Sequence, residues 1–275
     1  MDKILYLTRH AQAYHNVADD YTIRDAELTP LGREQSAALR RDTETTFQKD
    51  ADLIVSSPLR RPMQTALVGY APLIERLTKE GKPMLLLPEL QEVNDLPCDT
   101  GSSRTDLEAH PEFSSLDFSP LEPFSSSSSS SLPADAPPPH WSGAPTWNSK
   151  QGIFDPLRVE DRARWVRQWL RGDHHHLHHN EHARLGAEAE KIVVVAHGDI
   201  LRYIAYGKRG DETPWANAEV RAFRFQSASD PHATLVPATE IELVTKNNKT
   251  QEDGKEETVV KEGEAEPTSS EYLRN

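Results

Sequence analysis

Two short apolar runs, far apart in the chain, each lead into a histidine, and this pairing constrains the fold more than any other feature. Residues 4–7 lead through one threonine to Arg9 and His10, and residues 192–196 are followed at once by His197. Runs of this length and content are typical of buried strands. In an open α/β sheet, ligands bind at the carboxyl ends of the strands. We therefore expect both histidines to lie at one binding edge.

The remaining pattern alternates strands with helices. Residues 52–57 and 84–87 predict two more buried strands, residues 220–225 a half-exposed edge strand, and residues 240–244 a weak strand. Helices are expected from Thr29 and Pro30 onward, over residues 63–74 with a kink or end at Pro72, over 159–170, and over 200–205. This alternation predicts an α/β fold: a three-layer α/β/α sandwich with a mostly parallel central sheet.

Composition divides the chain into one domain, an insertion and a tail. We expect a single domain over residues 1–245, a low-complexity insertion at about 110–150 with a seven-serine run and a triple proline, and a disordered charged tail over 246–275. Phe113, Trp141 and Trp147 at the rim of the insertion are candidates for a lid over the site. The histidine-rich tract at 173–179 has no acidic or thiol partner at a diagnostic spacing, which favours a solvated loop over a metal site.

Charge and cysteine content limit the class of protein. The formal net charge of −13 argues against nonspecific binding to nucleic acid or to an anionic membrane. A single cysteine, Cys98, excludes an internal disulfide and fits a reducing compartment. The start of the chain lacks the long apolar core of a signal peptide. We expect a soluble cytoplasmic protein, with the nucleus as the alternative; the sequence leaves its oligomeric state open.

Several motifs, in order along the chain, resemble the histidine phosphatase superfamily, whose members are phosphoglycerate mutase-like. Residues 28–32 and 97–101 further resemble fungal and plant phosphoglycerate mutase-like proteins. The motifs that carry the resemblance are Arg9-His10-Ala11, Asn16, Ser57-Pro58-Leu59-Arg60, Leu90-Gln91-Glu92 and His197-Gly198.

The resemblance implies a phosphatase that hydrolyses a phosphomonoester, most simply of a small molecule, through a phosphohistidine. Arginine can hold two phosphate oxygens in a bidentate fork, and a neutral histidine can attack phosphorus. No metal ion and no cofactor is implied. The implied roles are His10 as the nucleophile, Glu92 as the general acid and base, Arg9, Arg60 and His197 as ligands of the phosphate oxygens, and Asn16 as an amide donor to the same phosphate.

Three departures from the family pattern qualify these roles. Ala11 replaces the usual glycine, which matters only if the backbone there is left-handed. Asp199 replaces a small residue, and its carboxylate would repel a strongly anionic substrate or bind a cationic one. The segment around Glu92, the expected general acid, lacks the Glu-Arg-His-Tyr-Gly sequence typical of the mutases, which favours hydrolysis over isomerisation.

Other interpretations stay open at this stage. The same fold could serve a non-catalytic regulatory or assembly subunit, or, with less support, a phosphoglycerate-type mutase. A sugar phosphate, a nucleotide, a phosphoprotein and a prenyl or other metabolite phosphate are all compatible substrates. For five further polar residues, substrate contact competes with a solvated loop: Gln12, His15, Arg24, Arg61 and Asp199.

Overall fold

A six-stranded sheet forms the centre of the molecule. The computed structural model describes residues 3–121, 144–173, 181–207 and 214–238, and residues 1–245 form one compact unit. Strands β1 to β4 pair in parallel, whereas β5 and β6 are antiparallel, in the order β3-β2-β4-β1-β5-β6. The predicted α/β fold with a mostly parallel sheet is confirmed. The strands are β1 (Ile4–Arg9), β2 (Leu53–Ser56), β3 (Leu85–Leu86), β4 (Lys191–Ala196), β5 (Val220–Phe225) and β6 (Leu235–Pro237).

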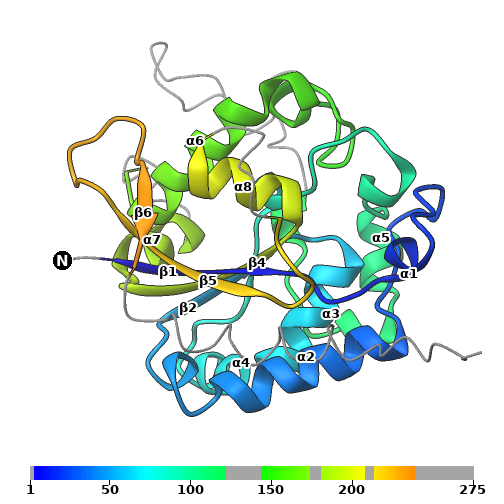
Figure 1. Ribbon diagram of the computed structural model, residues 1–275, viewed down its shortest axis with the longest axis horizontal. Helices are drawn as coiled ribbons and strands as arrows, with labels where there is room; N and C mark the ends of the chain where they lie inside the picture. Colours follow the sequence, from blue (N-terminus) through cyan, green and yellow to red (C-terminus); the bar gives the residue numbers. More distant parts are fainter. Residues whose placement is uncertain (1–2, 122–143, 174–180, 208–213, 239–275) are drawn as a thin grey trace, which may run out of the picture. The chain divides into compact units, whose positions relative to one another are not determined.

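Helices cover both faces of the sheet. In Figure 1, α2, α3 and α4 lie on one face, and α6 and α8 lie on the other. Helix α7 packs against α6, and α1 and α5 lie beyond the carboxyl ends of the strands. The predicted three-layer sandwich is therefore confirmed. The helices are α1 (Tyr14–Val17), α2 (Pro30–Thr43), α3 (Arg60–Gly69), α4 (Ala71–Lys79), α5 (Arg104–Glu108), α6 (Val159–Arg171), α7 (Glu181–Glu188) and α8 (Gly198–Tyr206).

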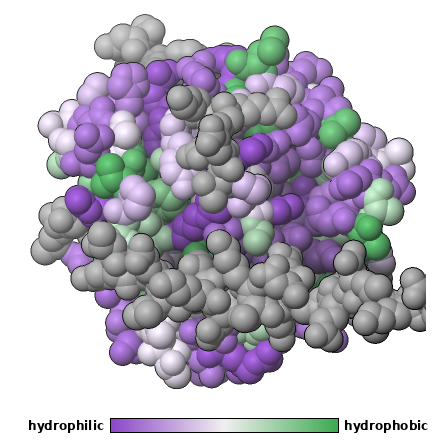
Figure 2. Space-filling model, viewed as in Figure 1, coloured by the Kyte–Doolittle hydropathy of each residue, from purple (hydrophilic) through white to green (hydrophobic). Residues whose placement is uncertain are grey.

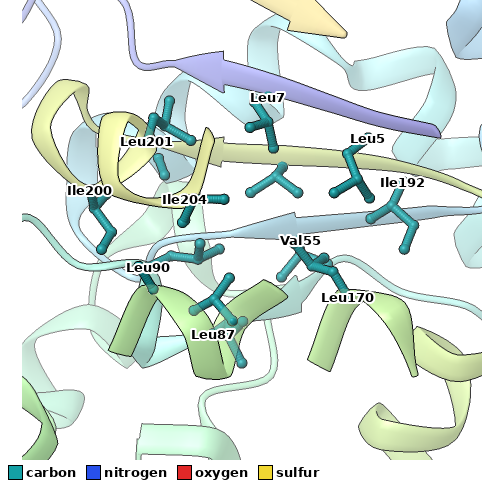
Figure 3. Close-up of a cluster of buried hydrophobic side chains, with 14 of the residues drawn as sticks. Leu5, Leu7, Val55, Leu87, Leu90, Leu170, Ile192, Ile200, Leu201 and Ile204 are labelled. Atoms are coloured by element: carbon teal, nitrogen blue, oxygen red, sulfur yellow. The ribbon is translucent and has the colours of Figure 1, made fainter. Parts of the chain in front are cut away.

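Strand β1 contributes apolar side chains to the hydrophobic cores on both faces of the sheet. Leu5 and Leu7 join the cluster under α6 and α8, while Tyr6 between them joins the cluster under α2, α3 and α4. Successive strand side chains point to opposite faces, so a strand covered on both sides must be apolar at every position. Figure 3 shows this on the α6 and α8 side, where Leu5 and Leu7 lie among side chains from α6, α8 and the neighbouring strands.

The helix expected to start at Thr29 does so, and its first turn is fixed by close packing. The Thr29 side chain accepts a hydrogen bond from the N–H of Gly32 at 3.0 Å. A β-carbon at Gly32 would stand 2.0 Å from the carbonyl oxygen of Gln12. Only glycine lets α2 approach the chain after β1 this closely.

Two elements differ from the sequence prediction. The segment expected as one helix with a break at Pro72 forms two helices, α3 and α4, and Pro72 occupies the first turn of α4. There proline's missing N–H costs no hydrogen bond. The predicted edge strand, β5, is internal, because it pairs with β1 on one side and with the short β6 on the other.

The rim of the low-complexity insertion belongs to the core. Phe113 and Trp147 are buried in the cluster under α2, α3 and α4, with exposed fractions of 0% and 2%. They are core residues, so the expectation of a lid does not hold for them. A β-carbon at Gly101 would stand 2.0 Å from the indole of Trp147, which shows how tightly this segment packs. Trp141, the strand expected at 240–244, most of the histidine tract and the 246–275 tail lie outside the described residues.

Hydrophilic residues dominate the face of the molecule seen in Figure 2, where apolar residues form only small separate patches. Within the described ranges, no helix has both the length and the apolar character needed to cross a bilayer.

Candidate active site

The register of the parallel strands brings the two histidines together. Arg9 at the end of β1 lies beside Ala196 at the end of β4, so the chains leave the sheet at the same level. The N–H of His10 donates to the carbonyl of Ala196 at 2.9 Å, and the rings of His10 and His197 lie 5.2 Å apart, edge to face. The meeting of two strands separated by about 190 positions is thus set by strand pairing.

A cavity of about 360 Å³ opens at this edge of the sheet. Its lining combines the end of β1 with residues of α1, the start of α3, the first turns of α8 and the segment after β3. The residues that line it are Arg9, His10, His15, Asn16, Asp19, Tyr21, Arg61, Glu92, Asn94, Leu96, Cys98, Asp99, Gly198, Asp199, Arg202, Pro214 and Trp215.

His10 is held with one ring nitrogen directed at the chain and the other at an arginine. Its Nδ1 lies 2.7 Å from the carbonyl oxygen of Ala11, and its Nε2 lies 3.1 Å from Nε of Arg61. A carbonyl only accepts and a guanidinium only donates, so Nδ1 carries the proton and Nε2 presents its lone pair. Burial, with the charges of Arg61 and Arg9, holds the pKa of His10 well below its usual value. The ring is therefore a neutral imidazole with its lone pair at Nε2.

The alanine that replaces the family's glycine is compatible with this geometry. Ala11 is fully buried, and its N–H donates to Oγ1 of Thr65 at 3.0 Å. It does not have the positive φ that five other non-glycine residues adopt. Because no left-handed conformation is needed at Ala11, a β-carbon there adds no backbone strain.

His197 is fully buried and oriented by a serine at the end of β2. Its Nε2 lies 2.9 Å from Oγ of Ser57, and that oxygen also accepts the N–H of Leu59 at 3.4 Å. Because the Ser57 oxygen already accepts the N–H of Leu59, its hydroxyl proton is the one that bonds to Nε2 of His197. That arrangement puts the imidazole proton on Nδ1, a buried atom without a hydrogen-bond partner. His197 thereby carries a neutral Nδ1–H, although it lies behind the residues that line the cavity and is not itself one of them.

Two of the arginines that line the cavity, Arg9 and Arg61, lie near His10. Arg9 donates to the carbonyl of Trp215, and its buried Nε has no hydrogen-bond partner. Arg61 is almost fully buried, and donates to His10, to the carbonyl of Cys98 at 2.6 Å and to the carboxylate of Asp99 at 3.2 Å. A buried guanidinium with this many fixed contacts is a preorganised anion ligand.

Arg60, the arginine expected at the phosphate, lies outside the cavity. Its guanidinium pairs with Glu27 at 2.9 Å, and its backbone N–H donates to Asp25 at 2.9 Å. Both arginines stand in the first turn of α3, where neighbouring side chains point about 100° apart. Arg61 shares its face with Thr65, which contacts Ala11, so Arg61 is the residue directed at His10.

Glu92 lies against the start of α8. Its carboxylate accepts the N–H groups of Val93 at 2.9 Å, Ile200 at 3.0 Å and Asp199 at 3.2 Å. Burial raises the pKa of Glu92 to about 7, and the nearby carboxylates of Asp99 and Asp199 add to the effect. A carboxyl group with this pKa can give and take a proton near neutral pH.

Asn16 and His15 line the same cavity. Asn16 accepts the N–H of Ala13 at 3.0 Å, and its amide nitrogen lies 3.0 Å from Nε2 of His15. Burial and the charges of Arg61 and Arg9 lower the pKa of His15 to about 3, which keeps the ring neutral. The other two open candidates lie elsewhere: Gln12 contacts Thr29, and Arg24 donates to the carbonyl of Gly101.

The structure also adds residues that sequence reasoning did not select. Asp99 holds Arg61, Trp215 receives Arg9, and Lys150 donates to the carbonyl of Glu92 at 2.7 Å. Burial lowers the pKa of Lys150 to about 7. All three depend on contacts between distant segments, and no local motif marks them.

Among the described residues, no group of three or more His, Cys, Asp and Glu side chains is arranged to hold a metal ion.

Comparison with known proteins agrees with the motifs. Residues 5–131 match the model of the histidine phosphatase superfamily (branch 1). A protein of Schizosaccharomyces pombe named as a probable phosphatase is 33% identical over 110 residues, which are 39% of this chain and 49% of that protein. A phosphoglycerate mutase-like protein of Arabidopsis thaliana is 31% identical over 153 residues, 44% of this chain and 55% of that protein. The chain thus spans about half the length of these two relatives.

Among solved structures, a mycobacterial glucosyl-3-phosphoglycerate phosphatase is 20% identical with a TM-score of 0.47, covering 86% of this chain and 97% of that one.

Proposed function

We propose that this chain, of which residues 5–131 match the histidine phosphatase superfamily, is a metal-independent phosphatase that hydrolyses a phosphomonoester through a phosphohistidine on His10. One observation carries the proposal: the neutral His10 ring presents Nε2 as a lone pair in a cavity that also holds two guanidiniums and a carboxyl group of raised pKa.

In the first step, Nε2 of His10 attacks phosphorus in line with the ester oxygen. The N–P bond forms as the P–O ester bond breaks, and protonated Glu92 gives its proton to the departing oxygen, so the alcohol leaves neutral. Arg9, Arg61 and the Nδ1–H of His197 donate to the three equatorial oxygens, whose charge these preorganised donors stabilise.

In the second step, a water molecule hydrolyses the phosphohistidine. Ionised Glu92 takes a proton from the water, whose oxygen bonds to phosphorus as the N–P bond breaks. Inorganic phosphate is released, and His10 and protonated Glu92 return to their starting states. The raised pKa of Glu92 suits both halves of this exchange, because the same group serves first as acid and then as base.

Hydrolysis of an aryl phosphate in the presence of EDTA tests the proposal. We expect the full-length protein to remain active under chelation and to lose activity in His10→Ala. His232→Ala is the matched control, because His232 is exposed and does not line the cavity. Rapid quenching of the wild-type reaction under alkaline conditions should trap an acid-labile phosphoryl group on His10, detected by mass spectrometry.

Equal activity in the wild type and His10→Ala would overturn the proposed nucleophile. Loss of activity in EDTA that zinc or magnesium restores would overturn metal independence. Inactivity of the folded wild type toward a broad panel of monoesters would favour a regulatory or assembly role for the same fold.

A further inference from the structure

The charges around the cavity leave little room for a second anion. Among the described residues that line it, three are permanent cations and four carry carboxyl groups. Arg61 is already paired with Asp99, and together with Arg9 it faces His10, where the phosphate would lie. The third cation, Arg202, is thus the one remaining charge that could anchor an acidic group elsewhere on a substrate.

Arg202 is neutralised by a residue on its own helix. Its guanidinium pairs with the carboxylate of Asp199, three residues earlier in α8, and both side chains are largely buried, with exposed fractions of 23% and 21%. Asn94 also approaches the Asp199 carboxylate, at 3.4 Å. Residues three apart on a helix face one another, so the pair is held by the helix itself. Partial burial reduces its screening by water.

The rest of the described lining includes several apolar side chains. Tyr21 and Leu96 line it with exposed fractions of 46% and 37%, and Pro214 and Trp215 lie on the lining as well. Asp19 beside Tyr21 adds a further carboxylate. A leaving group with an uncharged, partly apolar body could bury its surface here, whereas a carboxylate or second phosphate would meet negative charge.

We propose that the Asp199–Arg202 pair selects monophosphate esters whose leaving group carries no second negative charge. Asp199 does so by occupying Arg202, the cation that would otherwise bind such a group. This inference rests on the proposed phosphatase function and names the substrate class of the same site.

Two esters that differ by one carboxylate make the test: phenyl phosphate and 4-carboxyphenyl phosphate. We expect the wild type to prefer phenyl phosphate in kcat/KM. In Asp199→Asn, the freed Arg202 should change the ratio of the two kcat/KM values by about tenfold in favour of the carboxylated ester. In the double variant Asp199→Asn, Arg202→Gln, the gain should disappear.

The test compares the ratio of the two kcat/KM values, because Asp199 also influences Glu92, the proposed general acid. Its backbone N–H bonds to Glu92, and its charge contributes to the raised pKa of that carboxyl group. Both effects act on the two esters in the same sense. Comparing ratios between variants also cancels the different reactivities of the two phenolate leaving groups.

Three results would overturn the inference. The first is a ratio that is the same in the wild type and Asp199→Asn. The second is a wild type that prefers the carboxylated ester. The third is a strong wild-type preference for 4-(aminomethyl)phenyl phosphate over phenyl phosphate, which would make Asp199 an anchor for a cation. In each of these results the phosphatase function stands, whereas a wild type that hydrolyses none of the esters removes both proposals.

Discussion

Nε of Arg61 donates a hydrogen bond to Nε2 of His10 across 3.1 Å, so the guanidinium covers the lone pair that we propose attacks phosphorus. The contact keeps His10 in one tautomer, because a guanidinium can only donate. The contact also sets the order of events in the proposed mechanism. The Nε–H of Arg61 must first exchange its acceptor, from Nε2 of His10 to a phosphate oxygen, and only then can Nε2 bond to phosphorus. In the proposed mechanism, Arg61 therefore contacts both the nucleophile and the phosphate that it attacks.

The first prediction separates the two neighbouring arginines of α3. Arg61→Lys should lower kcat/KM for an aryl phosphate by about 10²–10³-fold, because a lysine cannot reproduce the fork that contacts His10, Cys98 and Asp99. Steady-state kinetics of the purified variants measures the effect.

Arg60→Lys is the matched control for this prediction. Arg60 faces Glu27, outside the cavity, so its replacement should leave kcat/KM close to the wild-type value. A large loss in Arg60→Lys together with a small one in Arg61→Lys would reverse the assignment and return Arg60 to the phosphate.

Arg60 and Arg61 illustrate a limit of prediction from the sequence. The chain's four parallel strands could be predicted because buried strands read as continuous apolar runs, and the two histidines followed from the strand ends. The motif Ser57-Pro58-Leu59-Arg60 placed Arg60 at the phosphate, whereas α3 begins at Arg60 and directs the next residue, Arg61, at His10. An error of one residue in helical phase rotates a side chain by about 100°, which is enough to exchange Arg60 for Arg61.

Contacts between distant segments were the other limit. Phe113 and Trp147 border a serine-rich stretch that cannot form a core alone, yet both are buried against helices that come much earlier in the chain. The composition of one segment does not predict which distant segments pack against it. Lys150 against Glu92 and Asp99 against Arg61 escaped prediction for the same reason.

The second prediction concerns Ser57, which orients His197 without lining the cavity. Ser57→Ala should remove the hydrogen bond that places the His197 proton on Nδ1, and should lower kcat by roughly tenfold with a smaller change in KM. Ser56→Ala is the control, since Ser56 is equally buried but bonds to the backbone of Ser57. The same loss in both variants would mean that the serines act only through packing.

The third prediction is a loss of stability in acid. Burial and the two cavity arginines lower the pKa of His15 from 6.5 to about 3 in the folded protein. Because the folded pKa is the lower one, the contribution of His15 to stability is present above pH 6.5 and is lost as the pH falls toward 3. His15→Gln should therefore lose less Tm than the wild type between pH 7 and pH 4. Exposed His232→Gln should behave like the wild type.

The fourth prediction tests the close approach of α2 to the chain after β1. Alanine normally stabilises a helix by about 1 kcal/mol relative to glycine. In Gly32→Ala the new β-carbon would meet the Gln12 carbonyl oxygen at 2.0 Å, so we expect destabilisation by about 2–4 kcal/mol instead. Urea unfolding measures the change, with Glu34→Ala at an exposed position of α2 as the control. A stabilised Gly32→Ala protein would show that the two segments do not pack this closely.

The fifth prediction concerns the pH dependence that Glu92 gives to activity and stability. Burial raises its folded pKa from 4.5 to about 7, with Asp99 and Asp199 adding to the shift. Its proton is needed for the proposed first chemical step, so kcat/KM should decline above about pH 7.

The same shift affects stability. Because the folded pKa of Glu92 is the higher one, its contribution to stability is complete below pH 4.5 and is lost as the pH rises through 7. Glu92→Gln cannot ionise, so its Tm relative to the wild type should increase between pH 5 and pH 8.5, and we expect the variant to be inactive. Glutamine also loses a hydrogen bond to the start of α8, but this loss lowers Tm at both pH values. Comparing the Tm difference between variant and wild type at the two pH values therefore removes its effect. A Tm difference that stays constant across this range would mean that the pKa of Glu92 is not raised in the folded protein, which would contradict its proposed role as the acid.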